Sequence, residues 1–254
     1  MKIFLSAVEG SAPREGLEKL IKDGYKFKWN LMSYYYIRNK NYDFAETMRD
    51  NSELIMIDSG AHSFQKGKKV SWVEYTKEYA EFIKKFDKPN VIGYFEMDVD
   101  NIIGYDKVLE LRKILENVSN KIIPVWHKNR GIEEFKKMCR EYQNKVIAIT
   151  GFKNEDIQDH QYLMFLKYAK KYNCKVHCLG MTRKKVLDKV PFDYVDSSTW
   201  LQQVVYGNVL ARKGQKFPKI KNKEDRKKQY ICNYKLGIEM QEKYYKKWKH
   251  ICKD

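Results

Sequence analysis

The chain has 254 residues, of which 43% are hydrophobic and 14% aromatic, so it can build a packed core and is not a disordered chain. No apolar run is long enough to span a membrane, and the start MKIFLSAV reaches Glu9 without the apolar region of a secretory signal. Five scattered Cys favour reduced thiols and a cytoplasmic location. A net charge of +17 indicates a polyanionic partner, nucleic acid before an anionic membrane surface.

Short β-rich runs alternate with helix-like segments along most of the chain. The runs cover residues 2–7, 27–32, 54–57, 91–97, 121–126, 146–150, 175–179 and 192–195. The helix-like segments cover residues 15–22, 42–49, 72–86, 105–116, 132–143, 157–172 and 182–189, the last with Thr182 as its N-cap. Strands separated by helices in a chain of this length predict a (β/α)8 barrel, with an open doubly wound sheet as the alternative.

The last part of the chain differs in composition from the rest. Residues 212–254 hold 15 Lys and Arg against 5 Asp and Glu. We expect residues 1–213 to form the barrel, closed by a helix over 201–213. Residues 214–254 then form a Gly/Pro/Lys linker and a basic, aromatic helix over 224–252, packed on or beside the barrel. This tail is expected to lie beside the active-site rim and hold a phosphate backbone.

Polar residues and glycines follow the predicted strands where each strand ends. Barrel enzymes build their active sites at this face, so these residues are expected to converge. They are Asp58, Ser59 and Gly60 after the third strand, Glu96, Asp98 and Asp100 after the fourth, His127 after the fifth, Gly151 after the sixth, Gly180 after the seventh and Asp196 after the eighth.

Two of these segments resemble the motifs of the tRNA-guanine transglycosylases. Residues 58–65, DSGAHSFQ, resemble the Asp-Ser-Gly-Gly/Ser-Phe-Gln motif, and residues 192–200, FDYVDSSTW, resemble the motif around the family nucleophile. The resemblance implies a covalent nucleophile at Asp196 and a general acid/base at Asp58. It also implies that Asp98 reads the guanine edge and that His127 stands where the family has Gln. Ser59, Gly60, Gly151 and Gly180 would lie against the base.

The chain departs from the family in ways that change the expected substrate. The Cys-rich zinc signature is absent, and Cys232, His250 and Cys252 do not replace it, so neither a structural zinc nor another cofactor is expected. A short chain without zinc resembles the phage and bacterial branch that inserts 7-deazaguanine bases into DNA. DNA is therefore the first expected substrate and tRNA the second, in the cytoplasm of the host cell if the chain is phage-encoded. The sequence does not decide between a monomer, a homodimer and a complex with a partner protein.

Basic residues on the loops and at the start of the tail are the expected phosphate contacts: Lys66, Lys68, Lys69, Arg183, Lys184, Lys185, Arg212, Lys213 and Lys216. Two other functions fit the same residues. Glu96, Asp98, Asp100 and His127 could bind a divalent cation for hydrolysis. Alternatively, the basic tail could belong to a catalytically inactive nucleic-acid-binding protein.

Overall fold

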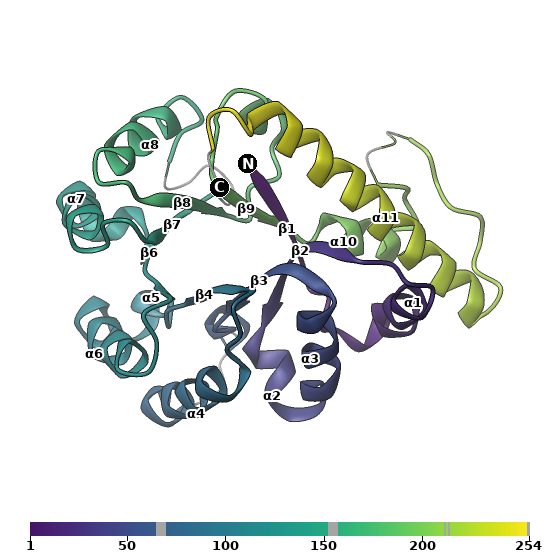
Figure 1. The fold of residues 1–254 in the computed structure, drawn as a ribbon, viewed down its shortest axis with the longest axis horizontal. Coiled ribbons are helices and arrows are strands. Elements are labelled where there is room, and N and C mark those ends of the chain that lie inside the picture. The colour runs from purple at the N-terminus through teal and green to yellow at the C-terminus, as the bar shows by residue number, and fades with distance from the viewer. Residues whose placement is uncertain (65–69, 152–156, 211, 213, 253–254) are drawn as a thin grey trace.

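The strands of the computed structural model form a nearly closed parallel barrel, which confirms the predicted fold class (Figure 1). The structure describes residues 1–64, 70–151, 157–210, 212 and 214–252. The strands run in the order β5-β4-β3-β2-β1-β9-β8-β7-β6, and every pair is parallel. Their bounds are β1 Lys2–Ser6, β2 Phe27–Ser33, β3 Ser52–Asp58, β4 Val91–Phe95, β5 Ile122–Ile123, β6 Val125–Trp126, β7 Val146–Thr150, β8 Lys175–Leu179 and β9 Tyr194–Ser197.

The barrel closes at Pro124, which divides one predicted strand into β5 and β6. Proline has no backbone N–H for a strand ladder. On one side of it β5 pairs with β4, and on the other side β6 pairs with β7. The Pro124 carbonyl still accepts from the backbone N–H of Ala148 at 2.8 Å. The two ends of the strand order are therefore adjacent pieces of one segment, as a closed barrel requires.

Helices follow most of the strands and pack around the barrel. Their bounds are α1 Ser11–Lys22, α2 Tyr34–Lys40, α3 Tyr42–Asp50, α4 Trp72–Phe86, α5 Asp100–Ile103, α6 Tyr105–Glu116, α7 Gly131–Glu141, α8 Tyr162–Lys170, α9 Lys184–Leu187, α10 Thr199–Val205 and α11 Lys223–Trp248. The short helices α2 and α5 were not predicted, because neither has the length that shows a helical period.

Several predicted helix boundaries differ from the structure. Helix α1 begins at Ser11 rather than at residue 15, and α8 begins at Tyr162 rather than at residue 157. The residue before α9 is Arg183, so Thr182 is not its N-cap. Helix α10 ends at Val205 rather than at residue 213, and the chain then folds back in a short antiparallel bridge between Asn208 and Lys216.

Side chains alternate between the two faces of each strand, and this alternation positions the site. On β1, Ile3 and Leu5 face the surrounding helices, while Phe4 lies in the cluster that fills the barrel interior. Met56 of β3 and Tyr194 of β9 belong to the same interior cluster. Residues two positions further along these strands therefore point inward at the carboxyl end. They are Ser6, Asp58 and Asp196.

The basic tail is an integral layer of the barrel rather than an appendage. Helix α11 packs against α1, α10 and β1 (Figure 1). The Gln241 amide donates to the carbonyls of Ile3 and Trp29, both at 2.7 Å, and the Tyr234 hydroxyl donates to Asn30 at 3.0 Å. Helix α11 therefore packs on the barrel, while the boundary at residue 213, which lies outside the described residues, stays a prediction.

The tail does not border the carboxyl-end rim along its second half, contrary to expectation. The Tyr245 ring lies 5.4 Å from the ring of Trp29, near the amino end of β2. The Trp248 indole donates to the carbonyl of Leu187 at 2.9 Å. This half of α11 lies at the amino ends of the strands, because its Tyr and Gln side chains pack on apolar groups and donate to backbone carbonyls there.

Candidate active site

Asp196 is held at the carboxyl end of β9 by three donors from β1, β8 and the residue that follows β8. Its Oδ1 accepts from His177 Nε2 at 3.0 Å and from the Gly180 N–H at 2.8 Å, and its Oδ2 accepts from the Ser6 hydroxyl at 3.0 Å. Burial alone would raise the pKa of Asp196, but these hydrogen bonds and the interaction with His177 outweigh it and lower the pKa. Asp196 is therefore an oriented, ionised carboxylate, and its side chain is still 16% exposed.

Asp58, at the end of β3, is a carboxyl of the opposite character. Burial, with the nearby charges of Asp196 and Asp98, raises the pKa of Asp58 to about 6, although the Gly60 N–H donates to its Oδ2 at 2.9 Å. Gly60 has φ of +74°, and a Cβ there would lie 2.3 Å from the Cβ of Tyr35. Only glycine fits this turn, which presents its N–H to the carboxyl.

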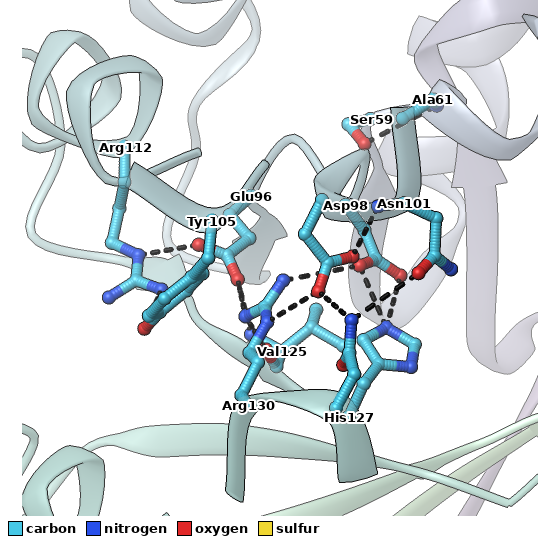
Figure 2. Close-up of polar contacts among 12 residues, drawn as sticks. Ser59, Ala61, Glu96, Asp98, Asn101, Tyr105, Arg112, Val125, His127 and Arg130 are labelled. Atoms are coloured by element: carbon cyan, nitrogen blue, oxygen red, sulfur yellow. Dashed lines mark hydrogen bonds and ion pairs between the residues drawn. The ribbon is translucent and has the colours of Figure 1, made fainter. Parts of the chain in front are cut away.

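Asp98 and His127 are paired, as Figure 2 shows. His127 Nε2 lies 2.8 Å and 2.9 Å from the two oxygens of Asp98. Burial alone would lower the pKa of His127, but the Asp98 carboxylate outweighs it and raises the pKa to about 9. The imidazolium is therefore the expected state at neutral pH. Asp98 remains 29% exposed, so the pair is accessible from the rim.

Arg130 organises the acidic residues that follow β4 (Figure 2). Its guanidinium lies 3.0 Å from Glu96, 3.0 Å from Asp100 and 3.5 Å from Asp98. Glu96 is fully buried and also accepts from Arg112 and from the Val125 N–H. Burial alone would raise the pKa of Asp100, but the hydrogen bond and charge of Arg130 lower it. Arg130 thus supplies the positive charge that this acidic segment needs.

This arrangement corrects the expected set of metal ligands. Asp98, Asp100 and His127 place ligand atoms within 4.8 Å of one another. Glu96 is not a member of that group, because both of its oxygens are used by internal donors. Arg130, whose side chain is 1% exposed, binds Asp100 at 3.0 Å, so its positive charge would oppose a cation at this cluster.

The three remaining residues predicted to bind the base have structural roles that the structure makes explicit. Ser59 is buried, and its carbonyl accepts from the Tyr75 hydroxyl at 2.7 Å. At Gly151, a Cβ would lie 2.6 Å from the carbonyl oxygen of Leu179 on the neighbouring strand. Gly180 adopts φ of +60° and gives its N–H to Asp196. A contact between any of these residues and a base stays a prediction.

The basic residues predicted to contact phosphate divide into three groups. Arg183 is turned inward, where its guanidinium binds Asp159 at 3.0 Å, the Gly151 carbonyl at 2.7 Å and the Tyr162 hydroxyl at 3.2 Å. Its side chain is 23% exposed, and its contact with phosphate stays a prediction. Exposed side chains belong to Lys184, Lys185, Arg212 and Lys216. Outside the described residues lie Lys66, Lys68, Lys69 and Lys213.

Two residues that sequence reasoning missed belong to this site. His177 lies in the middle of β8, where the alternating pattern predicts a residue of the barrel core. It is fully buried there, but it also forms a hydrogen bond with the carboxylate of Asp196. Glu9 follows β1 and is also buried. The available signals in the sequence were a histidine inside an apolar strand, His177, and a glutamate beside an apolar run, Glu9. Neither signal indicates which residue the side chain contacts.

The comparisons support the fold and leave the reaction open. No protein-family model and no curated protein matches the chain. A crystal structure assigned to a fructose-1,6-biphosphate aldolase from Coccidioides immitis is similar, with a TM-score of 0.57 and 11% identity. The match covers 95% of this chain and 89% of that one. In the part of the chain that the structure describes, no helix has the length and apolarity needed to cross a membrane.

Proposed function

We propose that this chain is a transglycosylase that replaces guanine in a nucleic acid, DNA before tRNA, with a 7-deazaguanine base. The observation that carries the proposal is the contrast between two carboxyls on one rim. Asp196 has a lowered pKa and three donors, whereas burial raises the pKa of Asp58 to about 6. When the pKa values of two carboxyls are shifted in opposite directions, the ionised carboxyl can act as the nucleophile and the other can transfer a proton.

Asp196 is the nucleophile in this proposal. Its Oδ1 accepts two hydrogen bonds, while its Oδ2 accepts one from Ser6 and keeps a lone pair for C1′ of the sugar. Attack at C1′ forms the Asp196–C1′ ester and sends the electron pair of the glycosidic bond to the departing base. The incoming base then reverses the step and releases the carboxylate.

Asp58 is the general acid and base. As an acid it protonates the ring nitrogen of the departing guanine, and as a base it takes the proton that the incoming base must lose. A pKa of about 6 suits both directions near neutral pH. Asp98, which lies beside the His127 imidazolium, accepts from guanine N1–H and N2–H₂. Adenine does not offer that donor pattern.

The experiment incubates purified protein with labelled guanine or 7-cyano-7-deazaguanine and either duplex DNA or tRNA. The polymer that gains label identifies the substrate. Asp196→Asn should abolish exchange and the covalent adduct while leaving binding nearly intact. Asp58→Asn should slow exchange by about 10²- to 10⁴-fold. The matched control is Asp193→Asn, three residues before Asp196 at the amino end of β9, which should exchange like the wild type.

The alternatives give different outcomes in the same assay. Full exchange by Asp196→Asn would overturn the nucleophile. A second outcome is that neither polymer gains label and the protein instead hydrolyses one of them in a reaction that EDTA abolishes. That outcome would favour a metal-dependent hydrolase built on Asp98, Asp100 and His127. Binding of nucleic acid without any reaction would favour an inactive binding protein.

A further inference from the structure

The amino ends of the strands surround a pocket of about 510 Å³ that the proposed function does not use. Its lining comes from the first residues of β1, β2, β3, β4, β8 and β9, together with α11. Lys2 lines it at one end of β1, and Ser6, which binds Asp196, lies at the other end, about 13 Å away at roughly 3.3 Å per residue. Pockets that hold small organic ligands have volumes of about 300–1,000 Å³. The amino-end pocket is therefore a cavity of ligand size, separate from the proposed active site.

Two lysines point into the amino-end pocket from inward-facing strand positions. Lys2 is the register partner of Tyr194, which belongs to the interior cluster of the barrel. Lys175 lies two residues before His177, whose ring contacts Phe4 in that cluster. Side chains two positions apart on a strand share a face, so both lysines face the barrel interior, and both line the pocket. Barrel interiors are normally filled by apolar side chains, so a pair of cations there is unusual.

The charge of the pocket lining is positive. Its charged members are Lys2, Lys28, Lys175 and Glu53. Lys28 is paired with Glu242 at 3.3 Å, whereas the Lys175 ammonium forms no hydrogen bond and no ion pair with any residue that the structure describes. Burial raises the pKa of Asp193, and the charge of Lys175 offsets only part of that effect. A concave site with an excess of cations attracts an anion, and lysine is a common ligand of phosphate.

Aromatic and aliphatic side chains form the rest of the lining. The rings of Trp29 and Tyr245 lie 5.4 Å apart, and the Lys2 ammonium lies 5.9 Å and 5.8 Å from their centroids. Leu54 and Ile92 add apolar surface from β3 and β4. Inorganic phosphate would use only the cations of this lining, and a neutral ring would use only its apolar part. A ligand that carries both an aromatic ring and an anionic group would use the whole pocket.

We propose that the amino-end pocket binds a small aromatic phosphate of the nucleoside monophosphate class. Lys2 and Lys175 hold the phosphate, and the base packs on the side of the pocket that Trp29 and Tyr245 form. A small molecule suits the site better than duplex DNA, because a duplex carries its phosphates on a convex surface and these lysines face into the mouth of the barrel. The proposal does not rest on the proposed function, since the pocket and Asp196 lie at opposite ends of the strands.

The first test is calorimetric titration of the full-length chain with AMP, GMP, CMP and UMP, with their nucleosides and with inorganic phosphate. At least one monophosphate should bind with one site per chain and at least about tenfold more tightly than its nucleoside or inorganic phosphate. K2M and K175M keep an apolar stem but lose the charge, so each should weaken that binding by about 10- to 100-fold. The matched control is K145M, an exposed lysine just before β7 on the same face of the barrel, which should bind like the wild type.

The second test locates the ligand by NMR. The indole N–H resonance of Trp29, assigned from W29F, should shift when the same monophosphate is added to the wild type and should shift equally in D196N. Neither test measures base exchange, so an absence of exchange would overturn the proposed function and leave this pocket untouched.

Three results would overturn the pocket as a nucleotide site. The first is that the wild type binds none of the monophosphates. The second is that K145M weakens binding as much as K175M does, or that D196N abolishes it. The third is that only a duplex oligonucleotide binds and that K175M weakens this binding, which would assign the lysines to a nucleic-acid surface.

Discussion

At the scale of single residues, the same side chain behaves in opposite ways according to its donors. Asp196 and Asp58 are both partly buried aspartates at strand ends. Asp196 receives three donors, one of them from His177, whereas Asp58 receives the Gly60 N–H and feels two other carboxylates. The number of donors and the sign of nearby charge therefore decide which carboxyl is ionised.

His177 offers a direct test of this account. His177→Phe keeps a ring between Phe4 and Phe95, whose centroids lie 6.3 Å and 5.0 Å from that of His177, but removes the donor to Asp196. Because that donor lowers the pKa of Asp196, its loss should raise the pKa. In a plot of exchange rate against pH, the acidic limb should then move to higher pH. Once the pKa of Asp196 exceeds the working pH, the rate should fall roughly tenfold for each further pKa unit.

The control is Phe95→Leu, which alters the packing on His177 and leaves the hydrogen bond in place. Its acidic limb should stay where it is in the wild type. If His177→Phe also keeps the wild-type limb, Ser6 and Gly180 suffice to hold Asp196 ionised. His177 would then be an interior packing residue.

At the scale of elements, we expect the short basic helix α9, which follows β8, to contact a phosphate backbone. In α9, Lys184 and Lys185 are 76% and 73% exposed, although each is close to an aspartate. The helix follows the strand end that carries Gly180, the residue that binds Asp196. The two lysines therefore lie on the chain segment that leaves the proposed site.

We expect K184E/K185E to weaken binding to all DNA sequences alike. Each lost phosphate contact should reduce the slope of log affinity against log salt by about 0.9 on duplex DNA. Fluorescence anisotropy over a range of salt concentrations measures this slope. The matched control is K84E/K85E, two exposed lysines in the last turn of α4, which should leave the slope unchanged. Equal effects of the two double variants would show that α9 contributes only net charge.

At the scale of the whole molecule, α11 completes the layer of helices around the barrel. Eight residues of this helix are buried, including Tyr230, Tyr234, Ile238 and Tyr244. Its Gln241 binds carbonyls of both β1 and β2. The helix that carries much of the positive charge is thus also a structural support for the first two strands.

We therefore expect a chain that ends at Asn222 to lose its cooperative unfolding transition. Removing α11 would expose the apolar side chains beneath it and leave buried backbone carbonyls without donors. Circular dichroism during urea denaturation measures the loss. A milder variant, Gln241→Leu, should lower the free energy of unfolding by about 1–3 kcal/mol. Glu239→Gln on the exposed face is its control. A truncated chain with the wild-type transition would show that the tail is an appendage.

The sequence by itself determined the barrel and the strand ends. The alternation of β-rich and helical segments is local, so it predicted the strands and placed Asp58, Asp98, His127 and Asp196 at one rim. Only the tertiary structure decided which of these side chains meet. The pairing of Asp98 with His127 depends on residues 29 positions apart, and that of Asp196 with Ser6 on residues 190 apart.

The same reason explains the contacts that the sequence did not predict. Arg183 was predicted to contact phosphate, and nothing in the sequence indicated that it also binds Asp159, Gly151 and Tyr162. Glu9 and His177 were not predicted to have a role, although both are buried. Burial and hydrogen-bond partners are set by segments that are distant in the chain, and no local pattern of residue types encodes them.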